Sequence, residues 1–227
     1  MAFIVFEGGE GTGKSSQLEI LCQRFKSAQL PCVKTREPGG TPLAENIRGL
    51  FKSVPAHGDI PVPKTELMLV MAARAQHFEK VIAPSVHRKE WMLCDRFLDS
   101  SYVYQAMLGG LPKEYVDAVG VGILGDFVPD LTFVFTIKQE VAQQRMKARI
   151  QSGIETGNAQ EPADRLDAFE ESVHARIDAG FIRLVEENWA YPAGKIPRRI
   201  LINAEGSLES VANTVAAHLQ NIFGISL

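Results

Sequence analysis

The chain has 227 residues, of which 45% are hydrophobic and 22% charged, a balance typical of one globular domain with a substantial core. Its net charge of −3 argues against a broad, sequence-independent nucleic-acid surface, which is usually basic. No stretch approaches the ~18 apolar residues of a membrane helix, and the apolar run 2–6 is too short for a signal peptide. The cysteines Cys22, Cys32 and Cys94 are far apart, without metal-binding spacing, so we expect a cytoplasmic protein in a reducing compartment.

Short apolar segments alternate with helical patterns along the chain. The expected strands are runs of apolar and β-forming residues bounded by turn residues. They cover residues 3–7, 32–36, 91–94, 131–137 and 198–203. The expected helices carry apolar residues three or four positions apart. They cover about 14–28, 43–51, 65–86, 115–125, 139–150, 169–184 and 208–219. The polar stretch 151–164 is expected to be a loop.

This alternation predicts the fold class. Strands that are nearly all apolar and are separated by helices indicate a parallel sheet covered on both faces. Right-handed crossovers then give an open sheet that binds ligands at the carboxyl ends of its strands. We therefore expect an α/β three-layer sandwich with a five-stranded parallel sheet.

The stretch FEGGEGTGKSSQ, residues 6–17, follows the first expected strand and opens the first expected helix. Within it, residues 8–15 match G-x-x-x-x-G-K-[ST], the loop whose backbone N–H groups wrap phosphate oxygens. Lys14 is expected to reach the β- and γ-phosphates of ATP, and Ser15 to offer an oxygen to Mg²⁺. The expected ATP-binding residues are Gly8, Gly9, Glu10, Gly11, Thr12, Gly13, Lys14, Ser15 and Ser16. The fold is thus of the P-loop NTPase, or nucleotide kinase, type.

A phosphate-binding loop alone does not choose between a kinase, a GTPase and a motor. A GTPase would need a guanine-reading N-K-x-D motif after a later strand, and the sequence has none. Basic and carboxylate residues at the strand ends favour phosphoryl transfer to a second, small anionic substrate. Arg36 and Arg96 could hold its phosphate, and Asp95 could work near the metal.

Further motifs resemble the thymidylate kinase family. These motifs are Thr35-Arg36-Glu37-Pro38-Gly39-Gly40-Thr41, Ala72-Ala73-Arg74, Asp95-Arg96-Phe97, Ser100-Ser101, Tyr104-Gln105 and Pro129-Asp130-Leu131-Thr132. They occur in family order from residue 3 to about 220, and TREPGGT is the most diagnostic. The resemblance implies Mg²⁺-dependent transfer of the ATP γ-phosphoryl group to dTMP, giving dTDP, by a homodimer.

The resemblance also assigns roles to residues. Glu10 faces the sugar 3′-hydroxyl and the metal region, Arg74 reaches the thymine O4 atom, and Tyr104 screens the sugar 2′ side. Asp95 works near Mg²⁺ or its water shell, so Ser15 and Asp95 are the expected metal residues. The expected substrate-binding residues are Glu10, Arg36, Pro38, Val70, Arg74, Arg96, Ser101, Tyr104 and Gln105. One departure stands out: Val70 occupies a position where many family members stack a phenylalanine on thymine.

The segment 145–166 resembles a mobile lid on a single domain spanning 1–227, and it is about ten residues longer than expected. Thr12 stands where some members carry an arginine, so lid arginines would have to neutralise the moving phosphoryl group. The expected catalytic residues are Lys14, Asp95, Arg149 and Arg165, while Arg145 is nearly as well explained as part of a solvated basic face.

Two alternatives stay open at this point. One is a kinase of the same fold that phosphorylates another monophosphate or a nucleoside, for which Val70 is the best support. The other is a regulatory P-loop protein with little turnover. An acceptor-phosphate site argues against the regulator, and a need for added monophosphate in ATP consumption would discriminate. The histidines show no ligand spacing, so no structural metal is expected.

Overall fold

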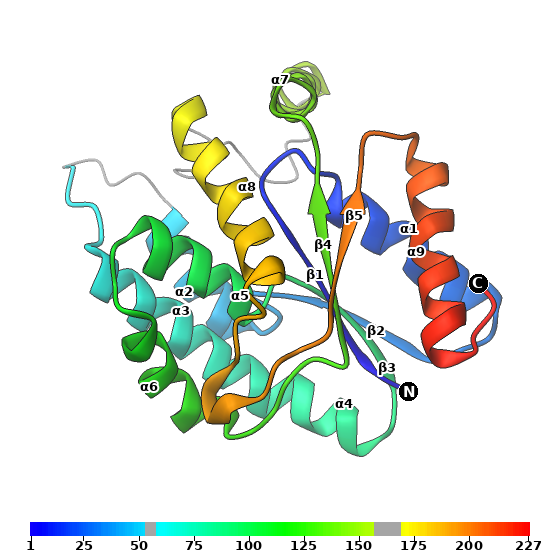
Figure 1. Ribbon diagram of the computed structural model, residues 1–227, viewed down its shortest axis with the longest axis horizontal. Coiled ribbons are helices and arrows are strands. Elements are labelled where there is room, and N and C mark those ends of the chain that lie inside the picture. Colours follow the sequence, from blue (N-terminus) through cyan, green and yellow to red (C-terminus); the bar gives the residue numbers. More distant parts are fainter. Residues whose placement is uncertain (53–57, 157–168) are drawn as a thin grey trace.

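The computed structural model describes residues 1–52, 58–156 and 169–227, with the backbone alone described for 149–156. One sheet of five parallel strands runs through it, in the order β2-β3-β1-β4-β5 (Figure 1). The strands are β1 (Phe3–Gly8), β2 (Cys32–Arg36), β3 (Trp91–Asp95), β4 (Leu131–Thr136) and β5 (Arg199–Asn203). All five expected strands and the three-layer α/β class are confirmed.

Helices cover both faces of the sheet (Figure 1). The α-helices are α1 (Lys14–Ser27), α2 (Pro42–Lys52), α3 (Pro63–His77), α4 (Ala83–His87), α5 (Leu98–Ser101), α6 (Lys113–Leu124), α7 (Gln139–Thr156), α8 (Glu171–Glu186) and α9 (Leu208–Phe223). The π-helical segments are η1 (Phe78–Ile82) and η2 (Tyr102–Leu108), and a 3₁₀ turn is η3 (Pro192–Gly194).

Side chains that alternate between the two faces of the sheet divide the core into two hydrophobic clusters. In β1, Phe3 and Val5 belong to the cluster beneath α3, α6 and α8. Ile4 and Phe6 belong to the other cluster, beneath α1 and α9. Successive side chains of a strand point to opposite faces, so one apolar strand can supply both cores. This two-faced burial keeps β1 rigid up to the loop that follows it.

Three segments differ from the expected elements. The expected helix 65–86 is α3, η1 and α4 in succession, with a π-helical turn before Pro84. α7 runs to Thr156, six residues into the expected polar loop. The segment 98–108, expected only as a set of motifs, is helical as α5 and η2. Gly109 and Gly110 end it, since Gly110 adopts a φ of 75° that other residues rarely take.

The carboxyl ends of the three strands on one side of the sheet lie level with each other. Phe6 pairs with Asp95 across β1 and β3, and Arg36 pairs with Asp95 across β2 and β3. The loop from Gly9 to Gly13 starts from this edge. Such an edge is where open parallel sheets bind their ligands.

Candidate active site

The loop between β1 and α1 is shaped by its glycines and by two internal hydrogen bonds. Gly11 has a φ of 76°, and a Cβ atom there would lie 2.5 Å from the carbonyl oxygen of Ala142 in α7. Gly13 caps α1 with a φ of 86°. The Lys14 ammonium donates to the Gly9 carbonyl at 2.7 Å, and the Thr12 hydroxyl donates to the same oxygen at 2.8 Å. The loop therefore wraps the first turn of α1, where free N–H groups can bind phosphate.

Lys14 is almost fully buried, with 5% of its surface exposed. Burial, and then the charge of Arg96, lowers the pKa of its ammonium below the usual value. The nearby carboxylates of Glu10, Asp95 and Glu7 act against this lowering. A buried cation with carboxylates around it is suited to exchange a carbonyl contact for a phosphate oxygen.

Ser15 and Asp95 meet at the first turn of α1. The Ser15 hydroxyl donates to Asp95 Oδ2 at 2.6 Å, and Asp95 Oδ1 is buried without a hydrogen-bond partner among the described residues. An unpaired carboxylate oxygen beside a hydroxyl is a donor set suited to Mg²⁺, which binds few protein oxygens and keeps waters and phosphates as its other ligands. The residues present therefore fit the metal. The described residues contain no cluster of three or more His, Cys, Asp or Glu that would hold an ion without a nucleotide.

Arg96 joins the phosphate loop to a second pocket. Its guanidinium contacts the Glu10 carboxylate at 2.5 Å and the Ser100 hydroxyl at 3.1 Å. Its backbone has a φ of 70°, a left-handed conformation that costs a non-glycine residue about 1 kcal/mol or more. The buried carboxylate of Glu7 fixes the same turn by accepting from the Phe97 and Ser100 N–H groups at 2.7 and 3.1 Å. Burial, and then Asp99, raises the pKa of Glu7 to about 7.

The second pocket lies between α2, α3 and η2. It brings together seven of the expected acceptor residues, namely Pro38, Val70, Arg74, Arg96, Ser101, Tyr104 and Gln105. Its other lining residues are Glu37, Phe51, Glu66, Phe97 and Ser100. Gln105 donates to Glu66 at 2.8 Å, which fixes its side-chain amide at the pocket edge. One side of the pocket is apolar and the other carries donors and acceptors, as in a site that orients a flat heterocycle.

Arg74 is held by a buried chain of hydrogen bonds. Its Nε donates to Glu37 at 2.6 Å and its two amino groups donate to Ser101 Oγ at 3.0 Å and the Phe97 carbonyl at 2.9 Å. His77 Nδ1 lies 3.0 Å from the second oxygen of Glu37. Burial alone would raise the pKa of Glu37, but Arg74 and His77 outweigh it and hold that pKa below its usual value. Arg74 is thus oriented before any ligand arrives.

Comparisons with known proteins agree with this geometry. The thymidylate kinase family model matches residues 6–212. The chain belongs to the thymidylate kinase family. A thymidylate kinase of Marinomonas sp. (strain MWYL1) is 36% identical over 97% of this chain and 94% of its own length. One of Pseudomonas putida (strain W619) is 38% identical over 97% of both chains. The crystal structure of thymidylate kinase from Ehrlichia chaffeensis superposes with a TM-score of 0.70 at 27% identity, covering 96% of this chain and 98% of that one.

Family membership makes the chain a nucleoside monophosphate kinase, which is a phosphotransferase. The regulatory alternative is therefore not favoured. None of the described helices has the length and apolar character needed to span a membrane.

Arg36 lies at the carboxyl end of β2 but does not line the acceptor pocket. Its guanidinium pairs with Glu45 of α2, with contacts of 3.2 Å from Nε and 2.8 Å from an amino group. The carboxylate also accepts from the Gly40 N–H at 3.0 Å, so it closes the glycine turn of TREPGGT. To bind an acceptor phosphate, Arg36 would have to exchange Glu45 for it.

Asp178 of α8 contacts the phosphate loop, and no pattern in the sequence indicated this contact. A Cβ atom on Gly9 would lie 2.1 Å from Asp178 Oδ1, so a side chain at this position would displace the Asp178 carboxylate. The carboxylate accepts a hydrogen bond from the Gly9 N–H. Burial, and with it the charge of Glu10, raises the pKa of Asp178 to about 6, although Lys14 and Arg96 lower it. α8 therefore supports the loop, and Figure 1 shows α8 beside it.

The expected lid falls mostly outside the described residues. Arg165 lies outside the described ranges, and for Arg149 only the backbone is described. Arg145 is described: its guanidinium donates to the Ala204 carbonyl at 3.1 Å and lies 3.7 Å from where a Cβ on Gly13 would be. This places Arg145 beside the loop that would hold ATP.

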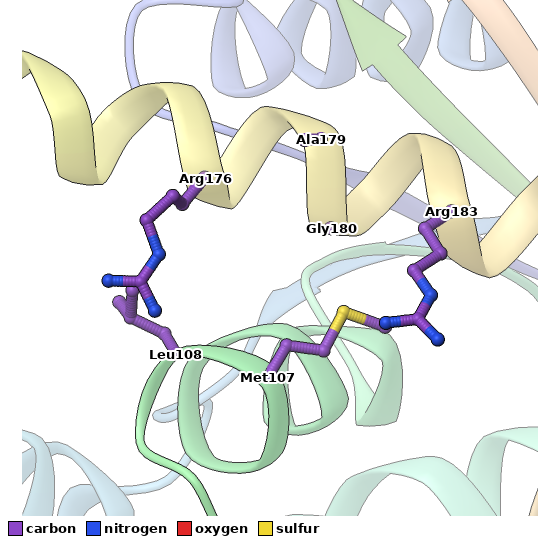
Figure 2. Close-up of a pocket in the computed structure, with 6 residues that line it drawn as sticks. All are labelled: Met107, Leu108, Arg176, Ala179, Gly180 and Arg183. Carbon is purple, nitrogen blue, oxygen red and sulfur yellow. The ribbon is translucent and has the colours of Figure 1, made fainter.

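A larger cavity, of about 210 Å³, lies away from these groups between α8 and η2. Figure 2 shows Arg176 beside Leu108 and the Arg183 guanidinium beside Met107, with Gly180 between them. Gly180 allows α8 to approach η2 closely, since a Cβ there would lie 3.1 Å from Val103. Neither the phosphate loop nor the acceptor residues line this cavity.

Four carboxylates and one histidine were missed as site residues. Glu37 lies inside TREPGGT, and His77 follows Arg74 by three positions on the same helix face, so spacing could have linked His77 to Arg74. Glu66, four residues before Val70, could have been placed on the pocket face in the same way. Glu7 and Asp178 carried no such signal, because their partners lie far away in the sequence.

Proposed function

We propose that the chain transfers the γ-phosphoryl group of ATP to dTMP, giving ADP and dTDP, with Mg²⁺. The observation that carries this proposal is the contact between Glu10 of the phosphate loop and Arg96 of the acceptor pocket, at 2.5 Å. The donor loop and the acceptor pocket therefore share a boundary. Phosphoryl transfer needs two anions held in line with their repulsion neutralised, and this boundary is where they would meet.

Four groups position the reacting phosphates. Lys14 and the N–H groups of the first turn of α1 hold the β- and γ-phosphates of ATP. Arg96 holds the phosphate of dTMP from the other side, and Glu10 keeps Arg96 in place until the phosphate arrives. The loose transition state of phosphoryl transfer needs little covalent chemistry, so positioning and charge neutralisation supply most of the rate.

Ser15 and Asp95 would hold Mg²⁺, in part through water. The ion supplies positive charge that neutralises the phosphate oxygens as charge moves between them. Removing it with EDTA should abolish turnover, and adding Mg²⁺ back should restore it.

The base is read by groups that the structure orients in advance. Arg74 would reach the thymine O4 atom, with Ser101 and Gln105 beside it. Tyr104 would screen the sugar 2′ position and disfavour ribonucleotides. The Tyr104 ring lies against the Arg96 guanidinium, with 5.2 Å from Cζ to the ring centre, so the sugar and phosphate subsites adjoin.

The chain is proposed to work as a single domain whose lid, about residues 145–166, closes over ATP. Arg149 and Arg165 would neutralise charge on the moving phosphoryl group, as arginine fingers do elsewhere for ~10³–10⁵ in rate. A double variant, Arg149→Ala with Arg165→Ala, should lose most of kcat with little change in the KM for dTMP. A double variant that turns over at the wild-type rate would contradict this role.

A cytoplasmic homodimer completes the proposal. The three cysteines are free thiols, as in a reducing compartment. Apolar side chains are exposed on and next to α3, including Val62 (61%) and Met68 (42%), and Val121 (46%) is exposed on α6. Packing these faces together would bury them. Analytical ultracentrifugation should give twice the 25.0 kDa chain mass, and Met68→Glu should shift it toward the monomer.

The deciding experiment measures ADP release from ATP and Mg²⁺ with dTMP, dUMP, dCMP, dGMP, UMP and AMP. We expect dTMP to be preferred and UMP to be inert. The dTMP/dUMP comparison is demanding, because one methyl group in an apolar pocket discriminates only ~10–200-fold. Preference for another monophosphate would replace dTMP as the substrate, and no stimulation by any acceptor would refute the kinase.

A further inference from the structure

Cys22 and Cys32 belong to different elements of the fold and meet at one end of the sheet. Cys22 lies in the middle of α1, and Cys32 is the first residue of β2. α1 packs on β2, and the two thiols form a hydrogen bond. Both side chains also pack against the hydrophobic cluster beneath α1 and α9. The packing of α1 on the sheet therefore holds the two sulfur atoms together.

A second contact between the same two elements supports this register. Lys34 of β2 forms an ion pair with Glu19 of α1. Glu19 precedes Cys22 by three positions, so these two side chains share a face of the helix. Cys32 and Lys34 are two positions apart in the strand, so they point to the same side of the sheet. One face of α1 and one face of β2 thus meet through two pairs of side chains, of which the thiols are one.

The thiol pair is accessible to a small solute. β2 lies at the edge of the sheet, beside β3. Cys22 and Cys32 are both partly exposed, whereas the third cysteine, Cys94, is buried in β3. Burial raises the pKa of the Cys94 thiol well above its usual value. Cys94 is therefore an unreactive thiol within the same chain, against which the pair can be compared.

Cys22 is the better nucleophile of the two. The hydrogen bond donated by Cys32 lowers the pKa of the Cys22 thiol, although burial acts against it. The Lys34 ammonium lowers the same pKa, against the charge of Glu19. The hydrogen bond to Cys22, and then burial, raise the pKa of Cys32. The thiolate is the form that attacks an oxidant, so Cys22 reacts first while Cys32 keeps its proton.

We propose that Cys22 and Cys32 are a peroxide-reactive thiol pair that closes to a reversible disulfide between α1 and β2. This modification site goes beyond the proposed kinase activity and does not depend on it. The sulfur atoms are already in hydrogen-bond contact and have to approach to ~2.05 Å. The structure describes no third His, Cys, Asp or Glu that would complete a metal site with these thiols. In reducing compartments such a disulfide is transient, as in redox sensing.

The reaction consumes one hydrogen peroxide and releases two waters. The Cys22 thiolate attacks one peroxide oxygen, so the S–O bond of a sulfenic acid forms, the O–O bond breaks and hydroxide leaves. Cys32 then gives up its proton and attacks the Cys22 sulfur, so the S–S bond forms and the S–O bond breaks. The two thiol protons convert the two hydroxides to water, and two electrons pass from sulfur to the peroxide. A dithiol reverses the reaction by thiol–disulfide exchange.

The first test treats the reduced full-length chain with increasing hydrogen peroxide, alkylates the remaining thiols with iodoacetamide in denaturant, and measures intact and tryptic masses. We expect the chain to lose two hydrogens, and the tryptic peptides 15–24 and 27–34 to appear as one disulfide-linked species. Cys94 should react at least about tenfold more slowly. Dithiothreitol should restore the original mass.

Two results of this test would overturn the proposal. One is that Cys22 and Cys32 are still alkylated at a peroxide concentration that oxidises Cys94. The other is a disulfide between two chains, which a non-reducing gel would show as a band of twice the chain mass. A linked species that migrates as a single chain supports the proposal.

The second test assigns the two roles. Cys32→Ser should leave a sulfenic acid at Cys22, which dimedone traps as an adduct of peptide 15–24. Cys22→Ser should give at least about fivefold less adduct at Cys32, because Cys32 is the poorer nucleophile. Melting curves like that of the wild type would show that both variants are folded. Adduct formation mainly at Cys32 would overturn the order of attack.

Lys34→Met tests the activation of Cys22 by its surroundings. Removing this ammonium should slow disulfide closure at pH 7 by about threefold and move the pH profile of the rate to higher pH. Lys147→Met, at an exposed position of α7, is the matched control and should leave the rate and its pH profile unchanged. The same profile in Lys34→Met as in the wild type would contradict the activation of Cys22 by Lys34.

Discussion

Arg74 on the acceptor side and Asp95 on the donor side of the active site differ in how completely their side chains are hydrogen-bonded. On the acceptor side, Arg74 makes hydrogen bonds to Glu37, Ser101 and Phe97, and it is 1% exposed. On the donor side, Asp95 Oδ1 is buried without a partner among the described residues, and the Ser15 hydroxyl lies at the surface. The Arg74 guanidinium is therefore oriented in advance, whereas the donor loop would be completed by the nucleotide and metal proposed to bind there.

The largest effect is expected from the donor side. Lys14→Met removes the cation that is proposed to bind the transferring phosphoryl group, so kcat should fall by about 10³-fold. Single-turnover kinetics with saturating ATP would measure it. Lys26→Met, at the exposed end of the same helix, is the control and should keep the wild-type rate. A Lys14→Met variant within tenfold of the wild type would mean that the loop does not use this cation.

A large loss of stability is expected when Arg74 of the acceptor pocket is replaced. Arg74→Met leaves the buried Glu37 carboxylate with His77 as its remaining side-chain partner among those described, and breaking one partner of a buried pair costs about 3–5 kcal/mol of unfolding free energy. Urea denaturation would measure it. Adding Glu37→Gln to Arg74→Met should recover part of the loss. Equal destabilisation in the single and double variants would show that the pair is not coupled.

Removing the charge of Asp178 is expected to change stability less than Arg74→Met does, and to raise it rather than lower it. Its pKa of about 6 in the folded chain lies above the usual value of 3.8, so ionisation costs the folded state stability as pH rises from about 4 to 6, and the cost persists at pH 7. Partial exposure reduces this cost to about 1 kcal/mol. Asp178→Asn keeps an acceptor for the Gly9 N–H and removes the charge.

Asp178→Asn should therefore raise the unfolding free energy at pH 7.5 and raise it less at pH 5. Urea denaturation at both pH values would measure the difference. Stabilisation that does not change between the two pH values would show that Asp178 does not titrate in this range.

The smallest effect on stability and activity is expected at Arg183, which lines the cavity between α8 and η2 and not the acceptor pocket. Its guanidinium pairs with Glu187 in an exposed i, i+4 pair at 2.8 Å. Such pairs contribute little, because water and salt screen them. Arg183→Ala should leave the melting temperature and both KM values unchanged within error. A changed KM for dTMP would mean that the cavity in Figure 2 communicates with the acceptor pocket.

The regular part of the fold was predictable because its signals are local. Each strand is a short apolar run, and the glycine-rich motif at residues 8–15 predicts the phosphate loop. The helical segment from Leu98 to Leu108 was not predicted, since its two serines, two tyrosines and one valine have weak helix propensity. Tertiary packing against α8 stabilises it instead.

Long-range contacts explain the rest of what was missed. Cys22 and Cys32 are far apart in the sequence, but α1 packs on β2 and the two thiols form a hydrogen bond. Glu37 lies in the TREPGGT motif, but its role is visible only in the structure, where it pairs with Arg74 of α3. Residues that act through partners distant in sequence leave no periodic pattern to read.

The strand order has a consequence for how the protein is made on the ribosome. β1 is synthesised first but lies at the centre of the sheet, between β3 and β4. At about 5–20 residues per second, its first partner strand emerges several seconds later. Asp178, which contacts the phosphate loop, is made later still. The nascent chain must therefore keep the apolar β1 from pairing elsewhere, and the ATP site is among the last parts to be completed.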